Sequence, residues 1–238
     1  MLSSSAIDDL VLTDAPQRPE PVDLRQARAV MIAPLATIAS PTASLTLVVF
    51  DASAATEWIP TKPAANKAQF TGHPAEVMRG LAKGEEVTTV DVGPSSGLAF
   101  ELEGKSGRIE AYRTAAAPLV LVAPPRTWWV EHHAEHEIEA LFAEALGAGD
   151  DASEVGEIEL TSGKLLAAYM WLKNMGAARE HAASVPSGGV ASFGDGYGDG
   201  DGALIVDLGP GRYRLARHET AAPWDDEQVL VTMFLTPA

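Results

Sequence analysis

The sequence contains no cysteine, which excludes disulfides, thiolate metal ligands and a cysteine nucleophile. Basic residues are also scarce, since 17 Lys and Arg stand against 33 Asp and Glu and give a formal net charge of −16. Nucleic acid is therefore a poor partner, because binding its phosphates needs clustered Lys and Arg. The charge favours a protein partner with a basic surface. The alternative is that the charge only keeps the protein in solution.

Long apolar runs are missing as well. No segment reaches the ~18 apolar residues typical of a membrane-spanning helix. The N-terminus carries Asp8 and Asp9 where a signal peptide would carry basic residues. We therefore expect a cytoplasmic protein that has no membrane segment.

Most of the remaining sequence has the pattern of β-strands. Leu45 to Phe50 is rich in β-branched and apolar residues, which predicts a buried strand. Pro74, followed by Ala75 to Ala82 and Gly84, predicts a short helix. Further strands, separated by Gly and Pro, are predicted at 87–92, 98–102, 107–112, 119–122, 157–160, 164–171, 203–206, 213–216 and 228–235.

The clearest predicted helix runs from Thr127 to Leu146. Thr127 is a suitable N-cap, apolar residues recur at helical spacing, and Gly147 follows the last turn. Between Thr127 and Gly163 there is no Lys or Arg, against ten Asp and Glu. The helix is therefore predicted to be acidic.

A short internal repeat divides the chain. Val90-Asp91-Val92-Gly93-Pro94 returns as Val206-Asp207-Leu208-Gly209-Pro210, displaced by 116 residues, and an alternating segment follows each copy. Each copy is expected to form a hairpin. The predicted fold is mainly β (α+β), with two related β-sandwich-like or meander modules joined by an acidic helix. Its parts are a flexible N-terminal arm (1–24), a first module (25–126), a linking helix (127–149) and a second module (150–238).

Several short motifs, most of them containing Gly, resemble the same protein family. They are Phe50-Asp51-Ala52 with Trp58, Leu81 to Glu85, Val90 to Gly93, Gly156 to Leu166 and Pro210 to Tyr213. They resemble a family of uncharacterised bacterial proteins known only as a domain of unknown function. The resemblance implies a β-rich architecture and a bacterial origin, and it implies no activity.

Two groups of residues are candidates for binding a divalent cation, and no other cofactor is predicted. Asp195, Asp199 and Asp201 lie in a Gly-rich loop, and hard cations prefer carboxylate and carbonyl oxygens on a flexible turn. The loop lacks the spacing of an EF-hand, and Gly and Asp are also ordinary turn residues. His132 and His136 are four residues apart and would share a helix face, as zinc-binding pairs do. The alternative for this pair is a solvated acidic helix face.

No nucleophile elbow, phosphate-binding loop or zinc-peptidase motif is present in the sequence. The leading hypothesis is a non-enzymatic binding protein that recognises a basic protein partner, as toxin-neutralising immunity proteins do. The alternative is a metal-binding protein or metal-dependent enzyme that uses His132 and His136 or the three aspartates. Aromatic residues at interfaces often anchor a partner, although they also seat helices in cores. The candidate partner-binding residues are Trp128, Trp129, Glu131, Glu135 and Glu139.

Overall fold

The computed structural model describes residues 34–39, 46–60, 62–63, 70–102, 108–115, 117–122, 132–172, 174–194 and 202–238. Several predicted features lie outside these residues. They are the N-terminal arm 1–24, Trp128, Trp129, Glu131, and the three aspartates Asp195, Asp199 and Asp201.

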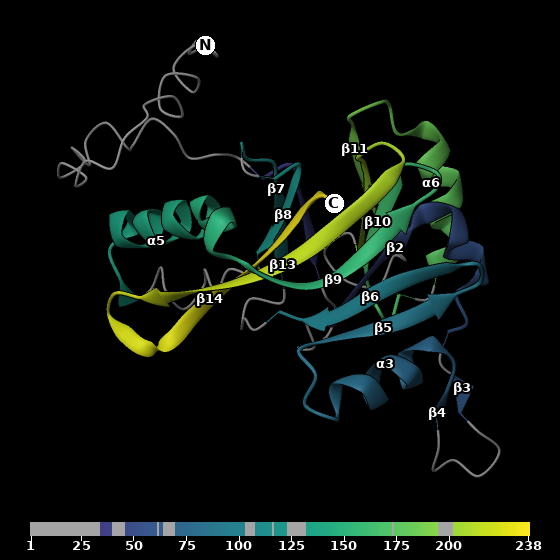
Figure 1. The fold of residues 1–238 in the computed structure, drawn as a ribbon, viewed down its shortest axis with the longest axis horizontal. Coiled ribbons are helices and arrows are strands. Elements are labelled where there is room, and N and C mark those ends of the chain that lie inside the picture. Colours follow the sequence, from purple (N-terminus) through teal and green to yellow (C-terminus); the bar gives the residue numbers. More distant parts are fainter. Residues whose placement is uncertain are drawn as a thin grey trace.

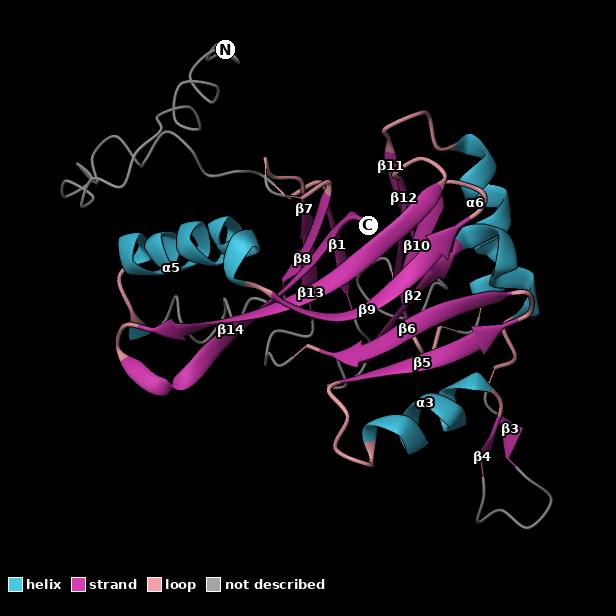
Figure 2. Cartoon of the chain, in the orientation of Figure 1, coloured by secondary structure: helices cyan, strands magenta, loops and turns pink. Residues whose placement is uncertain are grey.

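The protein is mainly β and contains two six-stranded antiparallel sheets (Figures 1 and 2). The first sheet has the order β1 (Ala36–Ala39), β7 (Arg108–Tyr112), β8 (Leu119–Val122), β14 (Asp225–Pro237), β13 (Gly211–Ala222) and β9 (Ser153–Leu160). The second has the order β11 (Val190–Phe193), β12 (Ala203–Asp207), β10 (Lys164–Tyr169), β2 (Thr46–Asp51), β6 (Ser95–Glu101) and β5 (Val87–Val92). A small hairpin joins β3 (Lys62–Pro63) to β4 (Phe70–Thr71).

Helices cover the outer faces of both sheets, so the molecule has four layers. In the described ranges the helices are α3 (His73–Leu81), α5 (Glu135–Gly147) and α6 (Ala178–Ser184), with the 3-10 turns η1 (Ala52–Glu57), η2 (Ala148–Asp151) and η3 (Met175–Ala177). Apolar side chains from both sheets form the central core. The outer face of the second sheet packs against η1, α3, η3 and α6, and α5 packs against the outer face of the first sheet.

Strand β2 shows why this arrangement selects such an apolar sequence. All six of its residues are buried, because Leu47 and Val49 face the central core while Val48 and Phe50 face the helical layer. A strand covered on both faces reads as a continuous apolar run instead of an alternating one. The predicted buried strand at 45–50 is therefore confirmed, as is the predicted short helix, which is α3.

The two sheets do not follow the division of the sequence into halves. Each sheet contains three strands that precede α5 and three that follow it. The halves join in the middle of each sheet, where β8 pairs with β14 and β2 pairs with β10. Neither half therefore has a sheet of its own, and the two share one central core.

The two copies of the repeated motif have different structures. Strands β5 and β6 pair with Val92 opposite Ser95, so the hairpin predicted at Gly93-Pro94 is confirmed. The hairpin predicted for 203–216 is wrong, because β12 lies in the second sheet and β13 in the first. Leu208 to Pro210 instead carry the chain across a corner between the sheets. The partners of β12 are β10 and β11, and those of β13 are β14 and β9.

Of the predicted helix 127–146, the structure describes the residues from His132 onward, and among these α5 begins only at Glu135. Ala134 has extended backbone angles (φ −71°, ψ 140°), and α5 starts at Glu135. The Glu137 carboxylate accepts a hydrogen bond of 3.0 Å from the Ala134 N–H, which stabilises this new start. Buried Ile138, Leu141 and Ala145 then attach α5 to the first sheet.

We expect Thr232→Val to stabilise the protein. Thr232 is fully buried on β14, and its hydroxyl has no hydrogen-bond partner among the residues that the structure describes. Valine keeps the shape and removes an unsatisfied polar group, so the free energy of unfolding should rise by about 1 kcal/mol in a urea titration. Thr236→Val, on the same strand at a half-buried position, is the control and should change it by less than about 0.5 kcal/mol. A lower stability of Thr232→Val would contradict the expectation.

Candidate functional site

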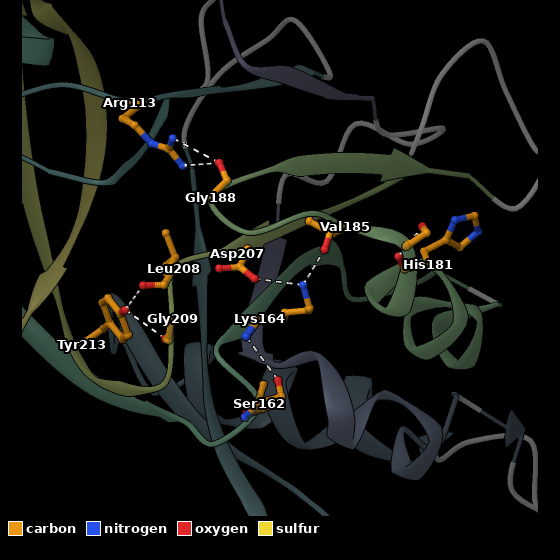
Figure 3. A network of polar contacts seen from close by, with 12 residues as sticks. Arg113, Ser162, Lys164, His181, Val185, Gly188, Asp207, Leu208, Gly209 and Tyr213 are labelled. Atoms are coloured by element: carbon orange, nitrogen blue, oxygen red, sulfur yellow. Dashed lines mark hydrogen bonds and ion pairs between the residues drawn. The ribbon is translucent and has the colours of Figure 1, made fainter.

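Polar contacts gather where the chain crosses between the two sheets (Figure 3). The crossing from β9 to β10 is Thr161 to Gly163, and the crossing from β12 to β13 is Leu208 to Pro210. Because β9 pairs with β13 and β10 pairs with β12, the two crossings lie side by side. We call Asp51, Ser162, Lys164, Asp207 and Tyr213, which surround them, the corner network.

Asp51 is the buried carboxylate of this network. It ends β2 and accepts four hydrogen bonds: from Ser53 N (2.8 Å), Ser162 Oγ (2.6 Å), Ser162 N (2.8 Å) and Thr161 Oγ1 (3.0 Å). Burial opposes ionisation, but the hydrogen bonds from Ser162 and Ser53 outweigh it and hold the pKa of Asp51 below its ordinary value. One ionised carboxylate therefore ties β2 and η1 to the first crossing.

Lys164 forms the second polar link. Its Nζ lies 2.9 Å from Asp207 Oδ2 and 2.7 Å from the Val185 carbonyl oxygen, and the two charged residues face each other across β10 and β12. The hydrogen bond from Lys164 lowers the pKa of Asp207. The Ser162 hydroxyl has other partners, since it donates to Asp51 and accepts from Lys164 N at 3.2 Å. Lys164 and Ser162 are thus not arranged as a base and a nucleophile.

The second crossing is held by hydrogen bonds to its backbone groups. The Gly163 carbonyl accepts hydrogen bonds from Leu208 N (2.9 Å) and Gly209 N (3.0 Å). Gly163 has a φ of +76°, and a Cβ there would lie 2.7 Å from Pro210 N, so only glycine fits. The Tyr213 hydroxyl donates to the carbonyls of Leu208 and Gly209. Burial, followed by the negative charge of Asp207, raises the pKa of Tyr213.

Arg113 extends these contacts to a neighbouring loop. Its two terminal nitrogens each lie 3.2 Å from the Gly188 carbonyl oxygen, and the next residue, Gly189, accepts a bond from Asp207 N at 3.0 Å. Figure 3 shows the Arg113 guanidinium pointing at the Gly188 carbonyl. The loop before β11 is therefore tied both to the end of β7 and to the end of β12.

The corner network was not predicted as a site, although its residues stand inside motifs quoted above. Asp51 belongs to Phe50-Asp51-Ala52, Lys164 follows Ser162-Gly163, and Tyr213 ends Pro210 to Tyr213. The motifs quoted for the family resemblance therefore contain these three residues. The pairing of β10 with β12, which brings Lys164 to Asp207, could not be read from them.

The predicted partner-binding residues Glu135 and Glu139 lie on α5, exposed and half-buried respectively. With the exposed Glu144 of α5 and Asp150 and Asp151 of η2, they form what we call the α5 acidic surface. None of these five makes an ion pair with a residue in the described part of the chain. In contrast, Glu154 and Glu157 of β9 pair with arginines of β13.

The predicted histidine pair does not share a helix face. The break at Ala134 separates His132 from His136, which lies in the first turn of α5. His133, between them, stacks on Trp224 with ring centroids 4.1 Å apart. Among the residues described, no group of three or more His, Asp and Glu is placed to hold a metal ion. A divalent-cation site at Asp195, Asp199 and Asp201 stays a prediction.

No protein-family model, curated protein or solved structure matches this chain. The resemblance to a bacterial family therefore stays a prediction. Within the described ranges, no helix is both long enough and apolar enough to cross a membrane.

We expect Asp51→Asn to destabilise the protein in a pH-dependent way. The amide cannot accept all four hydrogen bonds, so the free energy of unfolding should fall by about 2–4 kcal/mol near neutral pH. Because the pKa of Asp51 is lowered on folding, its contribution is present above the ordinary pKa and is lost as the pH falls through the folded value. The difference between the two proteins in urea titrations should therefore narrow below about pH 4. A constant difference down to about pH 2 would contradict this origin.

We also expect Gly163→Ala to loosen the corner. The new methyl group would meet the backbone of Gly209 and Pro210 at a positive φ, which should cost about 2 kcal/mol or more of unfolding free energy. Gly147→Ala is the matched control, because no atom of the described residues lies within 4 Å of its added Cβ. The control should be neutral or stabilising by about 0.5 kcal/mol. An equal change in melting temperature for the two variants would show that the close packing at Gly163 does not contribute to stability.

Proposed function

We propose that this protein is a non-enzymatic binding protein whose acidic surface recognises a basic surface on a partner protein. The observation that carries the proposal is the α5 acidic surface, whose five carboxylates have no counter-ion among the described residues. Two consecutive elements, α5 and η2, supply all five. A partner that provides Lys or Arg side chains would supply the missing counter-charges.

The distribution of the basic residues supports this proposal. On β13, Arg212 pairs with Glu157, and Arg217 pairs with Glu86 (3.4 Å) and Glu219 (2.5 Å). Lys164 is likewise paired with Asp207. These cations are used within the protein, so the negative field of α5 is not cancelled by them. Such a field raises the rate at which an oppositely charged partner associates.

The packing of α5 also supports the proposal. The helix is attached by buried Ile138, Leu141 and Phe142 to the outer face of the first sheet. Charged groups on a helix held in this way keep their spacing, which reduces the ordering cost of binding. In Figure 1, α5 lies along one end of the molecule, over the long β13–β14 hairpin.

The more specific proposal is an immunity-type role, in which the protein neutralises a toxin by masking a basic region of it. The −16 charge supports this role, as do the α5 carboxylates that lack a counter-ion within the described ranges. The corner network agrees with a binding protein, since its Ser, Lys and Asp side chains are occupied in holding loops together. A toxin gene next to the gene for this protein would support the specific form.

We expect the triple variant Glu135→Gln, Glu139→Gln, Glu144→Gln to associate more slowly with the partner. The partner is first captured from the native host at low salt, and association is then followed by surface plasmon resonance. The triple variant should lower the association rate constant about 10-fold at low ionic strength and change the dissociation rate constant little. Glu137 is left unchanged because it caps α5.

A matched control removes the same charge elsewhere. Glu101→Gln, Glu159→Gln, Glu180→Gln neutralises three exposed carboxylates that lie outside α5 and η2, and it should leave the association rate nearly unchanged. A salt-insensitive rate for the wild-type protein would count against the proposal. An equal loss in both triple variants would assign the effect to net charge and not to α5.

A further inference from the structure

We propose that the free edge of β5 is a docking site for an extended, basic segment of a partner protein, which would add to the second sheet as a further strand. This inference concerns a different part of the molecule from the α5 acidic surface (Figure 1). It does not rest on the function proposed above.

The other three sheet edges are short or interrupted. Strands β1 and β11 have four residues each and contact one another across the sandwich. Strand β9 has a register shift against β13. It also lies so close to β6 that a Cβ on Gly156 would be 2.8 Å from Leu98. Shortness and irregular register are among the means by which proteins protect sheet edges from added strands.

Strand β5 has neither form of protection. Its six residues pair with β6 in an unbroken register, and the strand contains neither Lys nor Pro. Because β9 crosses near β6, β5 extends beyond the first sheet, and Thr89 and Asp91 are exposed. Helix α3 packs on the opposite face, where Gly80 allows close approach to Thr88.

The hairpin geometry identifies the backbone groups that are available. Gly93-Pro94 is a two-residue turn closed by Val92 and Ser95, and such a turn is flanked by a hydrogen-bonded pair. Hydrogen-bonded and non-hydrogen-bonded pairs then alternate along the strand. The N–H and C=O groups of Val87, Thr89 and Asp91 therefore point away from β6. No other backbone hydrogen bond within the described residues uses them.

The charge near this edge selects the occupant. Glu85 and Glu86 precede the strand, Asp91 lies on it, and the Glu57 side chain lies against Gly93 at the turn. Arg217 pairs with Glu86 and leaves the other three acids without a described cation. An added strand with alternating Lys or Arg would place positive charge beside these acids, and opposite charges stabilise neighbouring strands.

The same charges disfavour a second copy of this chain. Antiparallel pairing of two β5 edges about Thr89 would place Asp91 of each copy opposite Val87 of the other. The aspartates would then lie close to Glu85 and Glu86, and like charges at such positions are destabilising. The structure therefore favours a different, basic chain.

The test compares Thr89→Pro with Thr89→Ala. Proline removes one outward N–H and alanine keeps it, while both remove the exposed threonine side chain. The probe is a synthetic peptide of alternating Lys and Val, with a Glu–Val peptide of the same length as its control. Binding is measured by fluorescence anisotropy, and amide hydrogen exchange is followed by NMR.

We expect the Lys–Val peptide to slow exchange at the amides of Val87, Thr89 and Asp91. Thr89→Pro should weaken its binding about 10-fold or more, because a ladder hydrogen bond and the continuity of pairing are lost. Thr89→Ala and the α5 triple variant should keep the protection at β5. A second variant, Asp91→Lys, should weaken binding of the Lys–Val peptide and strengthen that of the Glu–Val peptide. It keeps the test decisive if Thr89→Pro does not fold.

Three outcomes would overturn the proposal. The first is equal peptide binding by folded Thr89→Pro and Thr89→Ala, and the second is an absence of amide protection on β5. The third is concentration-dependent dimerisation in sedimentation that Thr89→Pro abolishes, because the edge would then pair with a second copy. None of these outcomes bears on the α5 acidic surface.

Discussion

The buried carboxylate of Asp51 is the constraint on which the corner between the two sheets depends. An unpaired charge at a fully buried position is costly, so its four hydrogen-bond donors must be held in place. Three of them come from Thr161 and Ser162, in the crossing from the first sheet to the second. That crossing in turn holds the second one, because the Gly163 carbonyl accepts from Leu208 N and Gly209 N. One charge therefore ties together two adjacent chain crossings, one between β9 and β10 and the other between β12 and β13.

The position of α5 follows from this corner. The long β13–β14 hairpin begins at the second crossing, and its β14 strand supplies Leu230 and Phe234 to the layer under α5. The acidic residues of α5 and η2 are thus presented by a sheet whose start is fixed by buried polar contacts. The arginines of β13 pair within the protein, two of them with Glu154 and Glu157 of β9, so the carboxylates of α5 and η2 keep no counter-ion among the described residues.

Local features of the fold could be predicted from the sequence, and long-range features could not. Continuous apolar character identified β2, and Pro74 with Gly84 identified α3, since both signals lie within a few residues. The break at Ala134 was missed because helical spacing continues across it, while the Glu137 cap and the stacking of His133 on Trp224 depend on tertiary structure. The contact of Lys164 with Asp207 was missed for a similar reason, because it needs the pairing of β10 with β12. For the candidate site, composition identified the acidic surface, whereas the corner network required strand register.

The repeated motif does not determine by itself whether a hairpin or a corner forms, because that depends on the neighbouring strands. Both copies reverse or redirect the chain at a glycine with positive φ, 59° at Gly93 and 83° at Gly209. After Gly93-Pro94 the chain returns along the same sheet, because β6 can pair with β5 on one side and with β2 on the other. After Gly209-Pro210 that position is unavailable, since β12 already lies between β10 and β11. The chain therefore crosses to the first sheet and pairs with β9. The turn residues specify that the strand must end, and the neighbouring strands decide whether a hairpin or a corner follows.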